Sequence, residues 1–333
     1  MGLPKTNSYL SQMKDEKLSF KEKVQITKEK SSRFLFGFNE KRGFVLKFVI
    51  YTLLVSIGFV YLYPMLHIFV TSMKSLADLL DSSIKWIPST FYKRNYEQAF
   101  SVMNLKAALK GSLSLSLIPT IFRVAAASLV GFGFARYEFP LKRTLFVLMI
   151  LTFIIPPQIL MMPKYRLFSE LGLTGSLNAF TIPAALGQGL NSSIFILLFF
   201  QFFKQTPQSL YEAAEVDGAS QLTLFFRIAI PMAVPAFIIS FLFSFVWYWN
   251  ETYLTTLYLT SQSNDITTVL LQLQQFEQNY EAMYPVVENS PNKINEGIKM
   301  AGTVISMLPL LVVYFFLQKY FVESVDRSGI TGE

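Results

Sequence analysis

The chain has 333 residues, of which 52% are hydrophobic and only 15% are charged. Soluble domains carry about 25% charged residues, so the composition argues against a soluble domain and indicates a polytopic membrane protein. The absence of Cys excludes disulfides, thiolate metal sites and a cysteine nucleophile, and the single His excludes a histidine metal cluster formed by this chain alone. The net charge of +7 could indicate nucleic-acid binding, but the basic residues lie beside apolar segments, as in membrane proteins.

Residues 1–45 form a basic N-terminal extension that is too long and too charged for the start of a signal peptide. The apolar run that follows is long enough to span a membrane, and no small-residue cleavage site follows it. We therefore expect this run to be retained as a helix. Within the extension, residues 19–38 mix Lys with Phe, Val and Ile, which fits either a solvated tail or an interfacial helix attracted to anionic lipid.

Six apolar segments have the length of roughly 20 residues that a spanning helix needs. They cover residues 46–70, 109–134, 144–163, 176–203, 228–250 and 297–318. The predicted fold is an all-α membrane domain of six transmembrane helices over 46–320, followed by a tail over 321–333. The third segment contains Pro156, Pro157 and Pro163, so a kink or partial unwinding is expected there.

Lys and Arg are concentrated on one side of these spans. Most lie in 1–47, 135–143, 204–227 and the C-terminal tail, and fewer lie in the intervening loops. Because cytoplasmic loops carry the excess of basic residues, both termini are predicted to be cytoplasmic.

Between the fourth and fifth spans, residues 204–231 read KQTPQSLYEAAEVDGASQLTLFFRIAIP. Thr206 can cap a helix that begins at Pro207, and Gly218 allows a sharp turn before a second amphipathic run. The pattern predicts a helix–turn–helix over 206–227 on the cytoplasmic surface. Its small residues would let another protein approach closely.

This stretch closely resembles the EAA motif of permease subunits in binding-protein-dependent ABC importers. The motif reads E-A-A, three residues, G, nine residues and I-x-L-P, and every spacing fits here, with Ile230 in place of the Leu. Four other stretches resemble the sugar-importer branch of the maltose G-subunit type: YPMLHIFVTSMKS, GFGFARYEFPLKR, WYWNE and QKYFVES. The resemblance covers about residues 46–333, although Ser324 and the final DRSGITGE depart from the family pattern.

The resemblance implies a MetI-like type I importer fold and a non-catalytic permease subunit in a bacterial cell membrane, translocating a sugar or oligosaccharide. The implied partners are a second permease subunit, a dimer of ATPase subunits, an extracytoplasmic solute-binding protein and membrane lipid, without nucleic acid. No cofactor is expected in this chain; ATP and Mg²⁺ would be bound by the ATPase subunits, since the chain lacks a G-x-x-x-x-G-K-[ST] motif. The residues expected to couple to the ATPase are Glu212, Ala213, Ala214, Asp217, Gly218, Ile228 and Pro231.

Arg123 lies near the middle of the second span, where a charge costs at least about 2.5 kcal/mol. No carboxylate lies within any span, so its partner could be a backbone carbonyl, water, the second permease subunit or a bound solute. An inter-subunit contact and a role in the translocation path both remain open. The residues expected along the path are Arg123, Gln188, Asn191 and Asn250, with no metal ligands or catalytic residues.

Other polar and aromatic residues allow two interpretations each. Four polar residues interrupt the fourth span and suit sugar hydroxyls, but ordinary helix–helix hydrogen bonding is favoured; they are Gln188, Asn191, Ser192 and Ser193. The aromatic run at 247–249 could stack on a sugar ring, although its position at the outer end of a span favours interfacial aromatics. His67 is interpreted as a packed or interface residue, and the acidic segment 251–296 as a solvated loop, a docking surface for the binding protein, or both.

Three other functions compete with a sugar importer. An importer permease for a non-sugar solute would carry the same motif. An ion-coupled secondary carrier usually needs an Asp or Glu within a span, and the predicted spans contain neither. A membrane enzyme lacks plausible catalytic groups.

Overall fold

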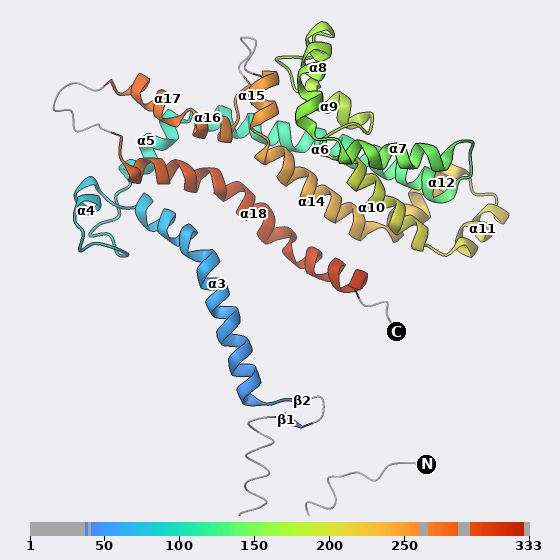
Figure 1. Cartoon of the computed structure of the whole chain (residues 1–333), viewed down its shortest axis with the longest axis horizontal. Coiled ribbons are helices and arrows are strands. Elements are labelled where there is room, and N and C mark those ends of the chain that lie inside the picture. Colours follow the sequence, from blue (N-terminus) through green and yellow to red (C-terminus); the bar gives the residue numbers. More distant parts are fainter. Residues whose placement is uncertain (1–36, 39–40, 260–265, 286–293, 330–333) are drawn as a thin grey trace, which may run out of the picture. The chain divides into compact units, whose positions relative to one another are not determined.

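The computed structural model describes residues 37–38, 41–259, 266–285 and 294–329. Over this part of the chain the structure is helical (Figure 1), apart from a short antiparallel hairpin of β1 (Gly37–Phe38) and β2 (Lys41–Arg42). The predicted all-α class is confirmed. Most of the predicted N-terminal extension lies outside the described residues, so its role stays a prediction.

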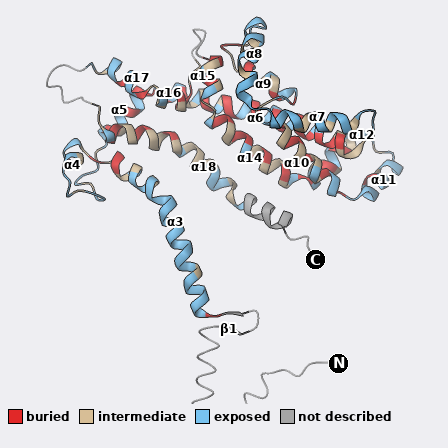
Figure 2. Ribbon diagram, viewed as in Figure 1, coloured by how far each residue is buried: buried red, intermediate tan, exposed pale blue. Residues whose placement is uncertain are grey.

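The chain divides into two compact units between His67 and Ile68. The first contains most of α3 (Phe44–Ser72), a helix of 29 residues that is about 44 Å long at 1.5 Å per residue. Among the described residues nothing buries its most apolar stretch, and Figure 2 shows the helix exposed over most of its length. Such an uncovered, thoroughly apolar helix is typical of a membrane span. His67 is exposed on it, with its ring stacked on that of Tyr63.

The second unit is built around α6 (Leu105–Arg136). Three helices pack against it: α9 (Asn178–Ala185), α10 (Ser192–Gln205) and α14 (Val234–Asn250). The packing against α10 is close because α6 presents a glycine there: a Cβ on Gly131 would lie 2.7 Å from the Cβ of Phe199. Buried aromatic rings fill the space around this crossing, so α6 is held on several sides.

The segment 251–296 is only partly a solvated loop, which was one of its two interpretations from the sequence. Its described part contains three short helices: α15 (Tyr253–Leu259), α16 (Val269–Gln274) and α17 (Phe276–Met283). Phe276 and Tyr280 are buried in an apolar cluster with α5 (Arg94–Val102) and α18 (Glu296–Gly329). A purely solvated loop is therefore wrong for this part, and the docking surface stays a prediction.

The predicted spans are only partly continuous helices. Three helices are long and apolar enough to cross a membrane: Phe44–Ser72, Leu105–Arg136 and Glu296–Lys319. Two bent pairs qualify only if each counts as one span: α7 (Lys142–Ile154) with α8 (Pro157–Glu170), bent by 99°, and Gln221–Met232 with α14, bent by 77°. The break expected at Pro156 and Pro157 is confirmed. By length and composition, the chain is a multi-pass membrane protein with three to five spans in its described part.

The fourth predicted span, 176–203, is wrong as one continuous helix. It is divided into α9 and α10 by the linker 186–191. The backbone of Gly187 has φ +72° and that of Asn191 has φ +50°, in the left-handed region that Gly and Asn tolerate best. The amide of Gln188 also donates to the carbonyl of Pro183 at 2.7 Å, which ends α9 in a tight turn instead of continuing it.

Candidate functional site

The predicted helix–turn–helix is present as α11 (Gln208–Val216) and α12 (Gln221–Leu224). Gly218 lies between them with φ +81°, a conformation that costs an L-residue about 1–2 kcal/mol. The amide of Ala219 donates to the carbonyl of Ala214 at 2.9 Å, closing the end of α11. We name α11, its turn and α12 the surface hairpin.

The predicted start of the surface hairpin is wrong by one residue. Pro207 is the N-cap of α11, and Thr206 is the C-cap of α10, so Thr206 does not cap α11. Both residues are extended, with ψ of 126° and 131°. A residue that precedes Pro is driven out of the helical region, which separates the two helices at this point.

The predicted coupling residues divide into exposed and packed groups. Glu212 and Ala213 on α11 and Asp217 and Gly218 in the turn are exposed, whereas Ala214 is half-buried. Val216, beside them, is 88% exposed. Ile228 lies in a π-helical turn, η1 (Phe225–Ala229), and packs against the buried aromatic cluster, while Pro231 lies exposed in α13 (Ile230–Met232). The exposed face of the surface hairpin thus presents two carboxylates, small side chains and one apolar side chain.

The other face of the surface hairpin is attached to the end of α6. Tyr211 is 3% exposed and packs against the ring of Phe132, and burial raises the pKa of its hydroxyl. The guanidinium of Arg136 lies 5.0 Å from the centroid of the Tyr211 ring and donates to Glu215 Oε1 at 3.0 Å. An aromatic contact, a cation–π contact and an ion pair therefore hold α11 against α6.

Arg123 is fully buried in the middle of α6. Its Nε donates to Ser244 Oγ on α14 at 2.6 Å, and its Nη1 donates to the backbone carbonyl of Leu190. The guanidinium lies 4.3 Å from the ring centroid of Phe195 and 4.6 Å from that of Tyr248. Of the partners that the sequence left open, a backbone carbonyl is the one found, and a bonded hydroxyl joins it.

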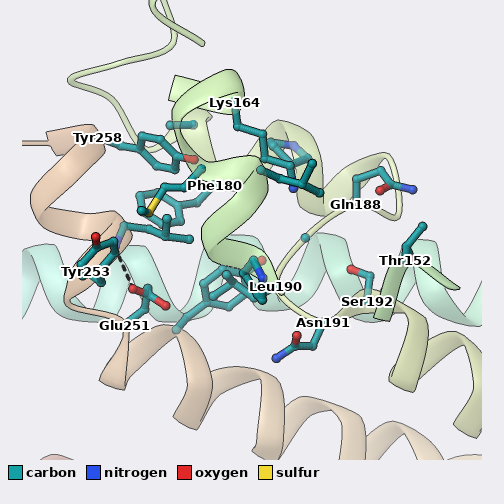
Figure 3. A pocket seen from close by; sticks show the side chains of 18 of the residues that line it. Thr152, Lys164, Phe180, Gln188, Leu190, Asn191, Ser192, Glu251, Tyr253 and Tyr258 are labelled. Carbon is teal, nitrogen blue, oxygen red and sulfur yellow. Dashed lines mark hydrogen bonds between the residues drawn. The ribbon is translucent and has the colours of Figure 1, made fainter. Parts of the chain in front are cut away.

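A cavity of about 500 Å³ lies beside this cluster. It is bounded by α8, by the linker between α9 and α10, and by the chain from the end of α14 to α15 (Figure 3). Ligand pockets typically have volumes of about 300–1,000 Å³ and a mainly apolar lining with a few polar groups. The neutral polar residues of this lining are Thr152, Gln158, Gln188, Asn191, Ser192 and Ser193.

Two charged residues also line the cavity, Lys164 and Glu251. Glu251 Oε1 accepts from the amide of Leu254 at 2.8 Å, which helps to start α15. Burial raises the pKa of Glu251 above its ordinary value. The lining can thus offer a solute hydroxyls, amides and one group of each charge.

The structure brings together only part of the predicted path. Gln188 and Asn191 line the cavity, Arg123 lies buried behind it, and the lining includes Glu251 instead of the exposed Asn250. The role of the four residues in the path stays a prediction.

Sequence reasoning gave too little weight to the aromatic run. Tyr248 and Trp249 are 1% and 3% exposed, so their interpretation as interfacial aromatics is wrong, and Tyr248 lines the cavity. Lys164 and Tyr258 were missed altogether, and no local pattern could have placed them beside the fourth span. Among the residues described, no group of three or more His, Asp or Glu could hold a metal ion.

Comparisons with known proteins agree with this geometry. The sequence pattern of the family described as binding-protein-dependent transport system inner membrane component matches residues 125–327. The osmoprotective compounds uptake permease protein GgtD of Synechocystis sp. is 29% identical over 298 residues, covering 88% of this chain and 95% of that protein.

Two further relatives carry names that refer to carbohydrates. The polygalacturonan/rhamnogalacturonan transport system permease protein YtcP of Bacillus subtilis is 27% identical, covering 85% of this chain and 97% of its own. The lactose transport system permease protein LacG of Rhizobium radiobacter is 26% identical, covering 84% and 94%.

A solved structure supports the fold. A chain of a bacterial ABC transporter involved in the import of the acidic polysaccharide alginate superposes with a TM-score of 0.66 at 22% identity, covering 83% of this chain and 96% of that one. Because the family pattern matches more than half of its residues, this chain belongs to the family of inner membrane components of binding-protein-dependent transport systems.

Proposed function

We propose that this chain is the permease subunit of an ATP-driven importer and that its surface hairpin receives the driving force from a separate ATPase. One observation carries the proposal. Glu212 and Ala213 on α11 and Gly218 in the turn stay exposed, while Tyr211 on the opposite face of α11 is buried against α6. A surface of small side chains on a firmly attached helix suits a protein partner that pushes or pulls on it.

In the proposed assembly, other subunits bind ATP, complete the path and deliver the solute. ATP and Mg²⁺ are bound by a dimer of ATPase subunits in the cytoplasm, where both termini of this chain also lie. A second permease subunit completes the path, and an extracytoplasmic binding protein delivers the solute. Glu212 and Asp217 bond to the ATPase, Ala213 and Ala214 permit its approach, and Gly218 sets the turn. Ile228 and Pro231 fix the hairpin to the following span.

The proposed solute is a sugar or oligosaccharide. The names of two relatives refer to carbohydrates, and the hydroxyls and amides of the cavity suit neutral hydroxyl groups. A second candidate is a non-sugar osmoprotectant, which the name of GgtD supports. Lys164 and Glu251 in the lining would suit a zwitterion of that kind.

Co-purification of the assembled transporter tests the hairpin's role. Glu212→Lys places a positive charge on the exposed face of α11 and should reduce the amount of ATPase that purifies with this chain. Glu138→Lys makes the same charge change at an exposed position between α6 and α7 and should leave that amount unchanged. Equal recovery of the ATPase with both variants would refute the contact at Glu212.

Uptake assays test the solute. Vesicles containing the full assembly and its binding protein would be offered a panel of oligosaccharides and zwitterionic osmoprotectants. Uptake of oligosaccharides alone supports the first candidate, and uptake of osmoprotectants alone supports the second. Uptake that persists without the ATPase subunits would instead support an ion-coupled carrier.

A further inference from the structure

The linker between α9 and α10 forms a wall of the cavity that no helix stiffens. Residues 187–193 all line the cavity, and 187–191 are outside regular helix. Two of its residues, Gly187 and Asn191, adopt left-handed backbone conformations. The shape of the cavity therefore depends on what fixes the linker in place.

Arg123 is the group that fixes it. Its guanidinium bonds the carbonyl of Leu190 in the linker and the hydroxyl of Ser244 on α14, while its own backbone belongs to α6. One side chain thus joins three parts of the unit that lie far apart in sequence. Arg123 does not itself line the cavity, and it is fully buried, so it can act on the cavity only through the residues that it holds.

Packing alone does not explain why a charged side chain occupies position 123. A buried charge is costly unless it is bonded, and an apolar side chain would fill the same space without that cost. Both of its bonds go to neutral groups, and the rings of Phe195 and Tyr248 flank the cation. The planar fork of Arg can hold two acceptors at once, which a Lys cannot do in the same way.

The hydrogen bonding around the linker is incomplete. Arg123 Nη2 and Ser192 Oγ are buried without a hydrogen-bond partner among the described residues, although buried polar groups are nearly always paired. Tyr248 Oη makes no hydrogen bond of normal geometry either. A Cβ on Gly189 would lie 2.7 Å from Tyr248 Oη and 3.2 Å from Ser192 Oγ, so the unpaired groups meet at the linker.

We propose that Arg123 is a positioning residue that ties the linker 187–191 to α6 and α14, so that this wall of the cavity moves with those two helices. The guanidinium makes no contact with the solute. The proposal rests on the proposed function only in treating the cavity as the place where the solute passes. A movement of α6 and α14 would then reshape the cavity directly.

Thiol labelling measures the state of the linker without requiring transport. The chain contains no Cys, so Gln188→Cys introduces the single thiol of this subunit on the cavity wall. Its rate of reaction with the methanethiosulfonate reagent MTSET would be measured in the assembled complex. Adding Arg123→Met should speed labelling about tenfold, because a charge-assisted hydrogen bond that holds the linker is lost. Arg123→Lys should restore the rate only in part.

A matched pair on α14 separates this role from general packing. Ser240 and Ser244 lie one turn apart and both are fully buried, but only Ser244 bonds Arg123, and the hydroxyl of Ser240 has no partner in the described structure. Ser244→Ala should speed labelling of Cys at position 188, and Ser240→Ala should not. A thiol introduced by Ile87→Cys, at a position that is 84% exposed and outside the cavity, should label at one rate in every background.

Two results would overturn the proposal. One is unchanged labelling at position 188 in a stably assembled Arg123→Met complex. The other is an equal effect of Ser240→Ala and Ser244→Ala on the labelling rate at position 188. This comparison also tests the proposal if the Arg123→Met complex fails to assemble. If labelling behaves as expected but the complex does not take up solute, the result would count against the proposed solute or the proposed ATPase coupling. It would not count against the positioning role of Arg123.

Discussion

Arg136, the last residue of α6, bonds Glu215 on α11 at 3.0 Å. This ion pair joins the surface hairpin to the same helix that carries Arg123 thirteen residues earlier, about 20 Å away along the axis. If the hairpin moves as proposed, this pair would pass the movement directly to α6. The pair is only partly exposed, with 12% and 37% of the two side chains accessible, so solvent screens it less than a typical surface pair.

We expect the two residues of this pair to show a coupling energy of about 1 kcal/mol, near the top of the range for exposed pairs. Arg136→Glu and Glu215→Arg each place like charges together and should lower the melting temperature of the purified complex. The combined exchange should recover part of that loss, because the opposite charges face each other again. Arg143→Glu, an exposed change of the same sign nearby, is the control. If the melting temperature of the double variant falls by the full sum of the two single decreases, the residues are not coupled.

The crossing of α6 and α10 should tolerate no side chain at Gly131. A Cβ there would lie 2.7 Å from the Cβ of Phe199 and 3.0 Å from the amide nitrogen of Phe200. Gly131→Ala should therefore destabilise the complex by about 1–3 kcal/mol. Gly133→Ala, two residues further along, meets nothing within 4 Å and should be neutral or stabilising. Thermal unfolding of both variants tests this prediction. Equal losses of stability in the two variants would mean that α6 and α10 do not approach closely at Gly131.

Gly218 should matter for its backbone conformation and not for space. It has φ +81°, and a Cβ there would meet nothing within 4 Å. Gly218→Ala should cost about 1–2 kcal/mol locally and reduce uptake per ATP hydrolysed, whereas Gly218→Asn should retain more function because Asn tolerates this conformation.

Gly172 provides the control for that change. It also has a positive φ, +67°, and open space around it, but it lies in the turn after α8, outside the surface hairpin. Gly172→Ala should carry a similar conformational cost without changing the ratio of uptake to hydrolysis. If both Ala variants change this ratio alike, the hairpin has no special role in coupling.

The features that could be predicted from the sequence are those that depend on local chemistry. Apolar runs indicated helices, Pro156 and Pro157 indicated a break, and Gly218 within a spaced motif indicated the turn. The start of α11 was wrong by one residue because Thr206 adopts the extended conformation that a following Pro imposes.

The features that the sequence did not predict depend on which segments meet in space. The division of the fourth span follows from the left-handed backbone conformations of Gly187 and Asn191. Hydropathy carries no information about these conformations. The partners of Arg123 lie 67 and 121 positions away in sequence, so only the fold could identify them. For the same reason Tyr248 was assigned to the membrane interface when it is buried in the unit.

The last prediction concerns acid sensitivity at α4 (Leu76–Leu80). Asp78 is 3% exposed, and its carboxylate accepts from the hydroxyl of Ser89 at 2.5 Å and from the amide of Ser75 at 3.3 Å. The Ser89 hydroxyl is the main cause of a pKa for Asp78 below its ordinary value of 3.8. The unfolded segment thus binds its proton more readily than the folded one, so the carboxylate stabilises the fold fully above about pH 4 and loses this effect as the pH falls through the lowered pKa.

Ser89→Ala should therefore reduce the protection of the α4 amides against hydrogen exchange at neutral pH, after correction for intrinsic rates. The difference from the unmodified chain should shrink as the pH falls through the lowered pKa of Asp78, because below it the carboxylate is protonated in both chains. Ser82→Ala removes an exposed hydroxyl from the same segment and should change protection at neither pH. A difference between Ser89→Ala and the unmodified chain that grows toward low pH would mean that the bond favours the protonated form of Asp78, contrary to the geometry.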